Sequence, residues 1–195
     1  MPQGLYVANN AGILQIDNTI TVLSYMGVGS VTAAPANPVI GETPTYISLE
    51  YGAMVSPTVA IRSEQRMRFS DCVFTGINKG AWAFNPNYVN VTWEAYFFDT
   101  PRNTPNYGLV LYKPDGTVSF DGSKKLVVVH DTITLNPANN YTASRTYTTG
   151  RRYAVIAPGV YVKVVGATVS CEGMFTSVAA AGGTINAIVI DVTGY

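Results

Sequence analysis

A single histidine, His130, offers the side chain that most often acts as a general base, and Asp131 follows it directly. A histidine base needs a nucleophile within hydrogen-bond reach and a carboxylate that orients its ring. Consecutive residues of a strand point to opposite faces, so Asp131 cannot easily orient the His130 ring if the run Val127–Asp131 is a strand. We therefore expect a strand histidine on a half-exposed face and no catalytic base.

Two pairs of carboxylates could serve a hydrolase, because glycoside cleavage needs two Asp or Glu side chains. Glu94 and Asp99 form one pair, and Asp17 and Asp121 form the other. Asp17 and Asp121 follow equivalent strand ends, where an aspartate commonly bonds its own backbone in a turn. Glu94 alternates with Trp93 along a regular strand and so faces solvent or a partner. We expect no catalytic residues, and a hydrolase is the less favoured alternative.

Residues that bind metals are too few and too scattered for a metal site. One histidine and two distant cysteines, Cys72 and Cys171, lack the close ligand spacing of zinc proteins. No Asp-rich loop resembles a calcium site. Each cysteine stands among apolar residues, which predicts a small buried side chain that stays reduced in the cytosol. The sequence predicts neither a metal nor a cofactor.

The polar segment Pro137–Arg152 is the first candidate for surface recognition. It is rich in Asn, Thr, Tyr and Arg, and Tyr and Arg are over-represented in binding hot spots. Long segments without a strand pattern are usually functional or disordered. We expect an exposed loop that contacts a neighbouring subunit or a surface ligand; an ordinary solvated loop is the alternative. The residues expected to make the contact are Asn140, Tyr141, Arg145, Tyr147, Arg151 and Arg152.

Trp82 is the second candidate for surface recognition. It lies in Gly80-Ala81-Trp82-Ala83-Phe84, next to glycine and Asn-Pro turn signals, so its ring could be exposed. With Trp93 it could form the aromatic platform of a carbohydrate-binding module. The alternative is a tryptophan that closes the end of a core, because large aromatic side chains are strongly buried.

The elements that must position these residues are strands. β-Branched and aromatic residues dominate the patterned segments, and Gly and Pro interrupt them repeatedly. Gly27–Thr45, with three prolines, is expected to be an exposed loop or arm. The pattern predicts an all-β fold, a β-sandwich built as one large or two small sandwich domains. The expected strands are Leu5–Val7, Leu14–Ile16, Thr21–Tyr25, Tyr46–Leu49, Thr58–Arg62, Arg68–Phe74, Val89–Phe98, Gly108–Tyr112, Val118–Asp121, Val127–Thr134, Tyr153–Ala157, Tyr161–Val165 and Ile185–Val192.

A hairpin pattern occurs twice, in Gly4–Asp17 and in Gly108–Asp121, with the copies 104 residues apart (108 − 4). Apolar residues alternate on both sides of a tight turn, which is Asn-Asn-Ala-Gly in the first copy and Pro-Asp-Gly in the second. Pro101 and Pro105 precede the second copy. The repeat predicts an N-terminal half over 1–104 and a C-terminal half over 105–195, either as separate domains or as one interleaved sandwich.

Composition and charge limit the partners. Lys plus Arg and Asp plus Glu number 12 each, so the formal net charge is zero, and charged residues make up 12% of the chain. Nucleic-acid binding needs a positive field, and the local cluster Arg62, Arg66 and Arg68 is interrupted by Glu64, so no nucleic-acid partner is expected. The chain has no run of about 18 apolar residues and no signal-peptide pattern, so we expect no membrane insertion and assembly in the cytoplasm. A surface so poor in charge is expected to be covered by other chains, in a homo-oligomer or a larger assembly.

The second hairpin, within Tyr107–Lys125, resembles a segment of small structural proteins of tailed bacteriophages. In these proteins a Tyr-Gly-(apolar) strand, an Asx-Gly turn and an Asp-Ser-(basic) end recur, often near the tail tip or its fibres. The corresponding residues here are Tyr107-Gly108-Leu109, Asp115-Gly116 and Asp121-Gly122-Ser123-Lys124. The opening Gly4–Asp17 is similar to the N-terminal start of the same kind of protein. The two stretches cover a small part of the chain and carry no catalytic residues.

The resemblance implies a non-enzymatic, β-rich virion protein of the distal tail, at the tip, the baseplate or a fibre attachment. Such a protein assembles in the host cytoplasm with other virion structural proteins and can contact a host surface glycan or protein. A capsid decoration or head–tail joining protein is one alternative, and a carbohydrate-binding module is another.

Overall fold

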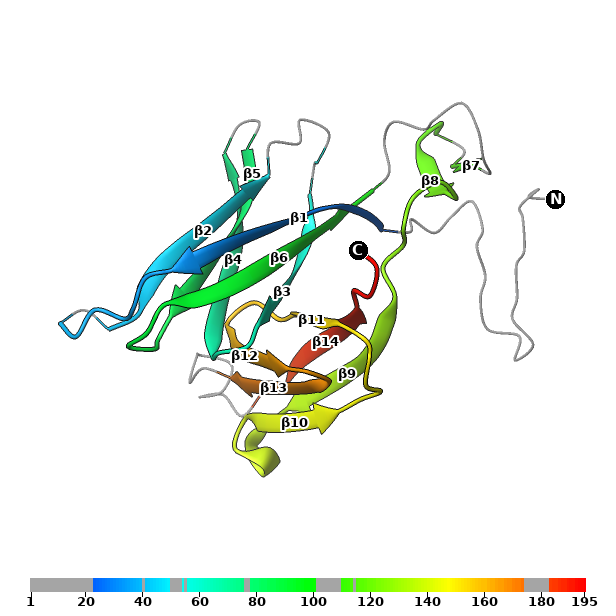
Figure 1. The fold of residues 1–195 in the computed structure, drawn as a ribbon. Helices are drawn as coiled ribbons and strands as arrows, with labels where there is room; N and C mark the ends of the chain where they lie inside the picture. The colour runs from blue at the N-terminus through cyan, green and yellow to red at the C-terminus, as the bar shows by residue number, and fades with distance from the viewer. Residues whose placement is uncertain are drawn as a thin grey trace.

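The computed structural model describes residues 23–39, 41–49, 54, 56–75, 78–100, 110–113, 115–173 and 183–195 (Figure 1). They form fourteen strands and one short 3-10 helix, η1 (Pro137–Asn139), so the predicted all-β fold is confirmed. The strands are β1 (Ser24–Ala33), β2 (Thr43–Leu49), β3 (Thr58–Ser63), β4 (Met67–Thr75), β5 (Asn78–Asn85), β6 (Val91–Asp99), β7 (Val110–Tyr112), β8 (Val118–Asp121), β9 (Val129–Leu135), β10 (Thr142–Thr146), β11 (Tyr153–Ile156), β12 (Val160–Val165), β13 (Thr168–Gly173) and β14 (Ile185–Asp191).

Two six-stranded antiparallel sheets form the body of the protein, and β7 and β8 form a separate two-stranded hairpin. Sheet I has the strand order β1-β6-β3-β11-β14-β9, and sheet II has the order β10-β13-β12-β4-β5-β2. The core holds inward side chains from both sheets, among them the fully buried Trp93, Phe97 and Tyr153 of sheet I and Phe69 and Met67 of sheet II. This arrangement is the predicted β-sandwich.

Alternation of apolar and polar residues decides which face each strand buries. In β12, Val160, Val162 and Val164 are buried in the core, whereas Tyr161 and Lys163 between them face outward. The side chains of a strand alternate with a period of two, so one face of β12 belongs to the core and the other to the surface. The same alternation in β13 gives sheet II an outer face made of polar side chains in this region.

A second apolar cluster covers the centre of the outer face of sheet I. It contains Tyr96 and Phe98 of β6, with Leu23, Val127 and Tyr195 packed against them from segments that flank the strands. The rings of Tyr195 and Phe98 are 6.0 Å apart, centroid to centroid. β6 is therefore buried on both faces toward its end, which accounts for its continuous apolar run there.

Two segments that were expected to be loops contain strands, so these expectations are wrong. β1 runs to Ala33 and β2 begins at Thr43, both inside Gly27–Thr45, and β10 lies inside Pro137–Arg152. β5 and β13 also lie outside the expected strands. Small and polar residues interrupt the apolar pattern of these strands, so the side-chain pattern gives little signal, and the strands are formed by backbone pairing with their neighbours. The expected strands Leu5–Val7 and Leu14–Ile16 lie outside the described residues.

Both halves of the chain repeat one strand connectivity. In the first half, β6 lies between β1 and β3 in sheet I, and β5 lies between β2 and β4 in sheet II. In the second half, β14 lies between β9 and β11, and β13 lies between β10 and β12. Each set of six strands has the connectivity of a shortened jelly roll. The hairpin β7–β8 precedes the second set, and the matching sequence Gly4–Asp17 precedes the first set, outside the described residues.

Register and burial support the equivalence residue by residue. Ile61 of β3 pairs with Ala95 of β6, and in the second half Val155 of β11 pairs with Val189 of β14. All four of these side chains are buried. The neighbours of Ile61 and Val155 are also alike, because Ala60 and Ala154 precede them, both fully buried on the opposite face. The two halves thus share a fold at the level of single positions.

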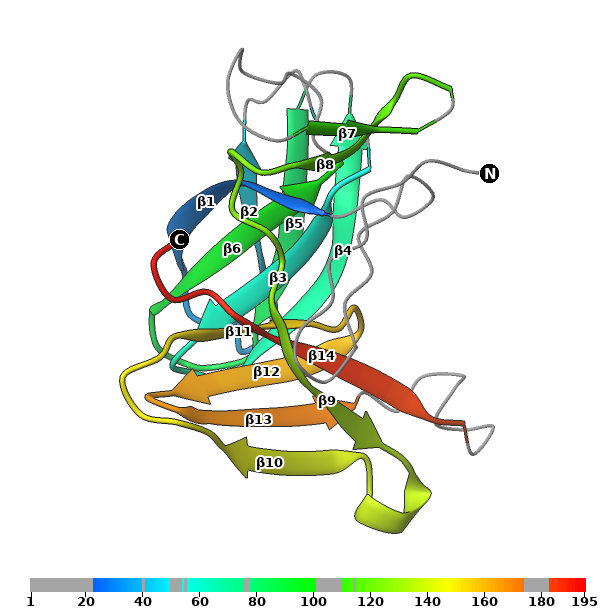
Figure 2. The same cartoon turned by 90° about the vertical axis from the view of Figure 1, so that its right-hand side faces the viewer.

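Equivalent strands of the two halves meet at the centre of each sheet. Val155 pairs with Ile61 in sheet I, and Tyr161 of β12 pairs with Arg68 of β4 in sheet II, both antiparallel. Antiparallel pairing of equivalent strands places an approximate two-fold axis between the halves, as in an isologous dimer. Figure 2 shows β1–β6 above β9–β14, with the hairpin β7–β8 at the top of the view.

The start of β1 and the segment that precedes β9 also pair with each other antiparallel, in agreement with the two-fold axis. Ser24 lies opposite Leu126, Tyr25 N donates to Lys125 O at 2.7 Å, and Val127 N donates to Leu23 O at 3.1 Å. The expected boundary near residue 104 falls in 101–109, outside the described residues. Strands from both sides of it share both large sheets.

Candidate functional site: the outer face of sheet II

The outer surfaces of the two sheets differ in what covers them. Sheet I is covered at its centre by the cluster around Tyr96 and Phe98. On sheet II the outward side chains alternate with core residues, and most are partly or fully exposed to solvent. This surface, called the outer face below, consists of Pro44 and Tyr46 of β2, Trp82 and Phe84 of β5, Arg68 and Ser70 of β4, Tyr161 and Lys163 of β12, Ser170 and Glu172 of β13, and Thr142 and Ser144 of β10.

Equivalent positions of the two halves carry different chemistry on the outer face. Tyr46 pairs with Trp82 across β2 and β5, and at the equivalent place Ser144 pairs with Ser170 across β10 and β13. The first half therefore presents aromatic rings where the second half presents hydroxyl groups. Because the halves share sheet II, the outer face is one continuous surface with an aromatic end and a polar end.

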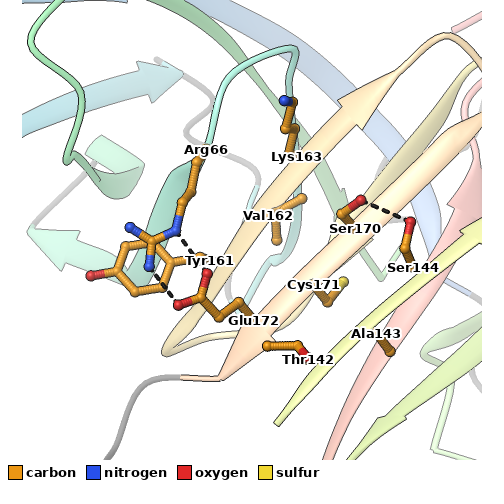
Figure 3. A pocket seen from close by; sticks show the side chains of 10 residues that line it. All are labelled: Arg66, Thr142, Ala143, Ser144, Tyr161, Val162, Lys163, Ser170, Cys171 and Glu172. Atoms are coloured by element: carbon orange, nitrogen blue, oxygen red, sulfur yellow. Dashed lines mark hydrogen bonds and ion pairs between the residues drawn. The ribbon is translucent and has the colours of Figure 1, made fainter. Parts of the chain in front are cut away.

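Arg66, in the turn between β3 and β4, connects the halves at the centre of this surface. Its guanidinium carbon lies 3.5 Å from the ring centroid of Tyr161. Its Nε and Nη2 donate to Glu172 Oε2 and Oε1 at 2.9 and 2.7 Å (Figure 3). The planar fork of arginine matches a carboxylate, so the pair is bidentate and directional. Arg66 belongs to the first half and both partners belong to the second, so the contact holds the halves together.

Arg68 forms the matching contact next to Arg66. Its Nε donates to Glu42 Oε2 at 2.6 Å, and its guanidinium carbon lies 4.0 Å from the ring centroid of Phe84. The hydroxyl of Tyr161 donates to Glu42 Oε1. Burial, this hydrogen bond and the charge of Glu42 raise the pKa of Tyr161, so the phenol keeps its proton and remains a donor. The centre of the outer face is therefore a network in which both arginines are compensated.

A groove of about 470 Å³ lies over β12, β13 and β10, beside this network (Figure 3). Ser144 Oγ and Ser170 Oγ lie 2.9 Å apart in it. Unlike Arg66, Lys163 has no acidic partner among the described residues. Two rows of outward side chains cross the groove in register: Lys163, Ser170 and Ser144 in one, and Tyr161, Glu172 and Thr142 in the other. The groove thus combines hydroxyls, one carboxylate and one uncompensated ammonium.

Tyr46 and Trp82 form an aromatic pair at the other end of the outer face. Their ring centroids are 5.0 Å apart and their planes differ by 39°. The ring of Tyr46 lies over Gly80, where an added Cβ would come within 2.2 Å of the ring. Glycine therefore permits the ring to rest on the backbone of β5, and the ring covers a position that has no side chain of its own.

The two tryptophans have different environments. Trp93 is 0% exposed in the core, and its Nε1 donates to Thr45 Oγ1 at 3.3 Å. The expectation that Trp93 could belong to an aromatic platform is wrong, because it lies on the inward face of β6. Trp82 is half-buried on the outer face beside Tyr46.

Arg145 and Tyr147, two of the expected contact residues, are bound to Asp131 of β9. Arg145 Nη1 and the Tyr147 hydroxyl donate to Asp131 Oδ2 at 2.6 and 2.9 Å. Burial raises the pKa of Asp131, but the hydrogen bonds from Tyr147 and Thr132 and the pairing with Arg145 outweigh it, so the net shift is downward. The Tyr147 ring also contacts His130, an exposed residue of β9, at 4.8 Å between centroids. These side chains connect β9, at the edge of sheet I, with the chain in and after β10, at the edge of sheet II.

Tyr141 does not lie in an exposed loop. It is 6% exposed and packs in the main core, so the expectation of a surface contact there is wrong. Asn140 and Tyr141 both have left-handed backbone conformations, with φ of 50° and 55°. This turn leads the chain from η1 into β10 and carries the Tyr141 ring inward. Asn140 remains exposed at the turn.

Arg151 and Arg152, the last two expected contact residues, pair with acidic residues of sheet I. Arg151 Nη1 forms an ion pair with Asp191 Oδ2, and Arg152 Nη2 donates to both oxygens of Glu94 at 2.8 and 2.9 Å. Glu94 also accepts a hydrogen bond from the Tyr96 hydroxyl at 3.0 Å. This carboxylate is therefore held by several donors on the surface of sheet I.

Asp191→Asn is expected to destabilise the protein at neutral pH by about 1–2 kcal/mol, because it weakens hydrogen bonds to a charged group. Burial raises the pKa of Asp191, but hydrogen bonds from Thr193 and the pairing with Arg151 lower it overall. A carboxyl with a lowered folded-state pKa stabilises the fold above its unfolded pKa of roughly 4, and this stabilisation is lost as pH falls through the folded pKa. In urea unfolding, the difference in the free energy of unfolding between wild type and variant should be smaller at pH 3 than at pH 7.

Glu64→Gln is the control for this measurement, since the Glu64 side chain is 70% exposed and lies 3.6 Å from its partner Arg62. It should have little effect at either pH. A loss for Asp191→Asn that is equal at pH 7 and pH 3 would contradict the electrostatic account and point to packing.

Cys171 is a free, buried thiol, as the sequence predicts, and burial raises its pKa to about 12. The side chain of Cys72 is outside the described part of the structure. Among the described residues, no group of three His, Cys, Asp or Glu side chains is placed to hold a metal ion. Within the same residues, no helix has the length and apolar character to cross a bilayer.

Among the residues that build the outer face, Trp82 is the one that stands out in the sequence as a candidate for surface recognition. Arg66 and Arg68 were considered only as part of an interrupted basic cluster, and Lys163 was not considered. The usable signal was the alternation in Val160–Val165 and Thr168–Gly173, which marks outward residues. It does not reveal which of them come together, because that depends on strand pairing.

Comparisons with known proteins add no relative from which a residue role could be transferred. No family model matches the chain, and no curated protein or solved structure is significantly similar to it.

Proposed function

We propose that this chain is a structural protein of a tailed bacteriophage, located in the distal tail, where it assembles with copies of itself and with other virion proteins. The observation that carries the proposal is the repeated hairpin, whose second copy resembles a segment of such proteins. In the fold this copy includes β7 and β8, and Val118–Asp121 are buried. Asp121 Oδ1 accepts from the backbone N and the hydroxyl of Ser123 at 2.9 and 2.6 Å, the turn role expected of it. The motif is therefore an architectural part of the second half.

The surface of the chain also suits assembly. The six arginines of the described residues all form ion pairs within the chain, so none of them carries an unpaired charge that opposes association. Val39 is 89% exposed and Tyr88 is 75% exposed. Their loops lie together, because Ala36 N donates to Asn87 O at 2.6 Å. Exposed apolar residues on braced loops are suited to contacts between subunits.

Antibody labelling of intact particles, viewed by electron microscopy, tests the proposal. Antibody against the purified chain should label the distal tail, and antibody first absorbed with that chain is the control. Label over the head would contradict the tail position and support the alternative of a decoration or head–tail joining protein. Particles that contain no label and no copy of the chain by mass spectrometry would overturn the virion proposal.

A further inference from the structure

We infer that the outer face of sheet II binds an acidic oligosaccharide, with one sugar ring stacked on Tyr46 and Trp82 and another held in the polar groove. The inference rests on the proposed function in one respect, since it supplies the ligand for a host-surface contact. The binding itself depends only on the side chains of this face, so it can be tested on the purified chain.

The aromatic end is suited to the apolar side of a sugar ring. Tyr46 rests on the backbone at Gly80, and Trp82 lies beside it with ring centroids 5.0 Å apart. An aromatic ring that lies flat on a sheet has one face against the backbone and the other face directed away from the sheet. The C–H side of a pyranose can bury apolar area against such a ring, while its hydroxyls stay in water.

The polar end is suited to the hydroxyls of a sugar. Neighbouring strands lie roughly 4.8 Å apart, so each three-residue row of the groove spans roughly 10 Å. Hydroxyl groups such as those of Ser170 and Ser144 both donate and accept, and the carboxylate of Glu172 accepts. Neighbouring hydroxyls on a pyranose present the same mixture of donors and acceptors.

The distribution of charge at the groove favours an acidic ligand. Arg66 is compensated by Glu172 and Arg68 by Glu42. Lys163 has no acidic partner in the described structure, which leaves one positive charge at the groove. A carboxylate or another anionic group on the sugar would supply Lys163 with the acidic partner that it lacks there.

The two ends are far enough apart to require an oligosaccharide. From β5 to β13 the order is β5-β4-β12-β13, which is three strand spacings, or roughly 14 Å. A single sugar cannot cover this distance, whereas a short chain of linked sugars can. The path between the ends crosses Arg68 and Arg66, whose guanidinium groups lie over the rings of Phe84 and Tyr161.

A glycan array that carries neutral oligosaccharides and matched uronate-containing ones, about three to six sugars long, tests the inference with the purified full chain. Wild type should bind uronate-containing members more tightly than their neutral counterparts. Lys163→Gln should weaken binding to the acidic members about tenfold and remove the preference. Gly80→Ala should displace the Tyr46 ring and weaken binding to acidic and neutral members alike. Lys124→Gln, which removes an exposed lysine outside this face, should leave binding unchanged.

The outcomes separate this inference from the particle assignment. Binding to no member of the array, equal binding to acidic and neutral members, or equal losses for Lys163→Gln and Lys124→Gln would each overturn it. None of these results affects the labelling of particles, and a chain absent from particles could still bind the array. Both lysines are exposed, so circular dichroism of the variants should match wild type and exclude misfolding as the cause of a loss.

Discussion

Val155→Asp is expected to unfold both halves of the chain together. Val155 is fully buried, and its backbone pairs with Ile61 of the first half. An unpaired buried charge costs about 3–5 kcal/mol or more, a large part of the 5–15 kcal/mol that typically holds a domain folded. Both tryptophans, Trp82 and Trp93, belong to the first half. Loss of native tryptophan emission would therefore report that the first half has unfolded, although the substitution lies in the second.

Val165→Asp is the matched control. It makes the same substitution in the second half, at a valine that is 49% exposed, and should change the free energy of unfolding by no more than about 0.5 kcal/mol. The milder Val155→Ala should fold and should give coincident thermal transitions by tryptophan emission and by far-UV circular dichroism. If Val155→Asp kept native tryptophan emission while circular dichroism lost part of its β signal, the halves would unfold independently, which would contradict their coupling through Ile61 and Val155.

Trp93→Ala is expected to lower the free energy of unfolding by about 3–5 kcal/mol, the usual cost of removing a buried aromatic side chain. Trp93 is the largest fully buried side chain among the described residues, and its indole N–H donates to Thr45 across the sandwich. The substitution leaves a cavity between β6 and β2 and an unpaired hydroxyl group. Urea unfolding followed by far-UV circular dichroism measures the loss.

Trp82→Ala provides the comparison for that measurement. Trp82 is half-buried on the outer face, so its removal should cost less than half as much as the removal of Trp93. Equal losses would contradict the distinction between a core tryptophan and a surface tryptophan, and would remove Trp82 from the proposed binding face.

The fold class could be predicted from the sequence because it depends on local pattern. Alternation in Tyr161–Val165 and turn residues such as Pro158-Gly159 report a period of two and a chain reversal directly. The burial of Tyr141 could not be predicted, since its left-handed backbone follows from the connection of η1 to β10. A polar segment rich in Tyr and Arg looks the same whether its side chains meet a partner or their own sheet.

The candidate site could not be predicted because its residues are far apart in the chain. Arg66 and Glu172 are separated by 106 positions, and β4 must pair with β12 before they can meet. No local pattern contains that information. The repeated hairpin does indicate a repeat, but it does not reveal that equivalent strands of the two halves pair with each other.

The approximate two-fold axis has a consequence for how this protein can change. In a homodimer of one such half, a single gene would encode both sides, and every substitution would appear twice, at both symmetry-related places. Here the peptide chain encodes each copy separately, so Trp82 can stand at a position whose equivalent is Ser170. The chain keeps the self-complementary join of a dimer at Ile61 and Val155, while selection can act on the two surfaces independently.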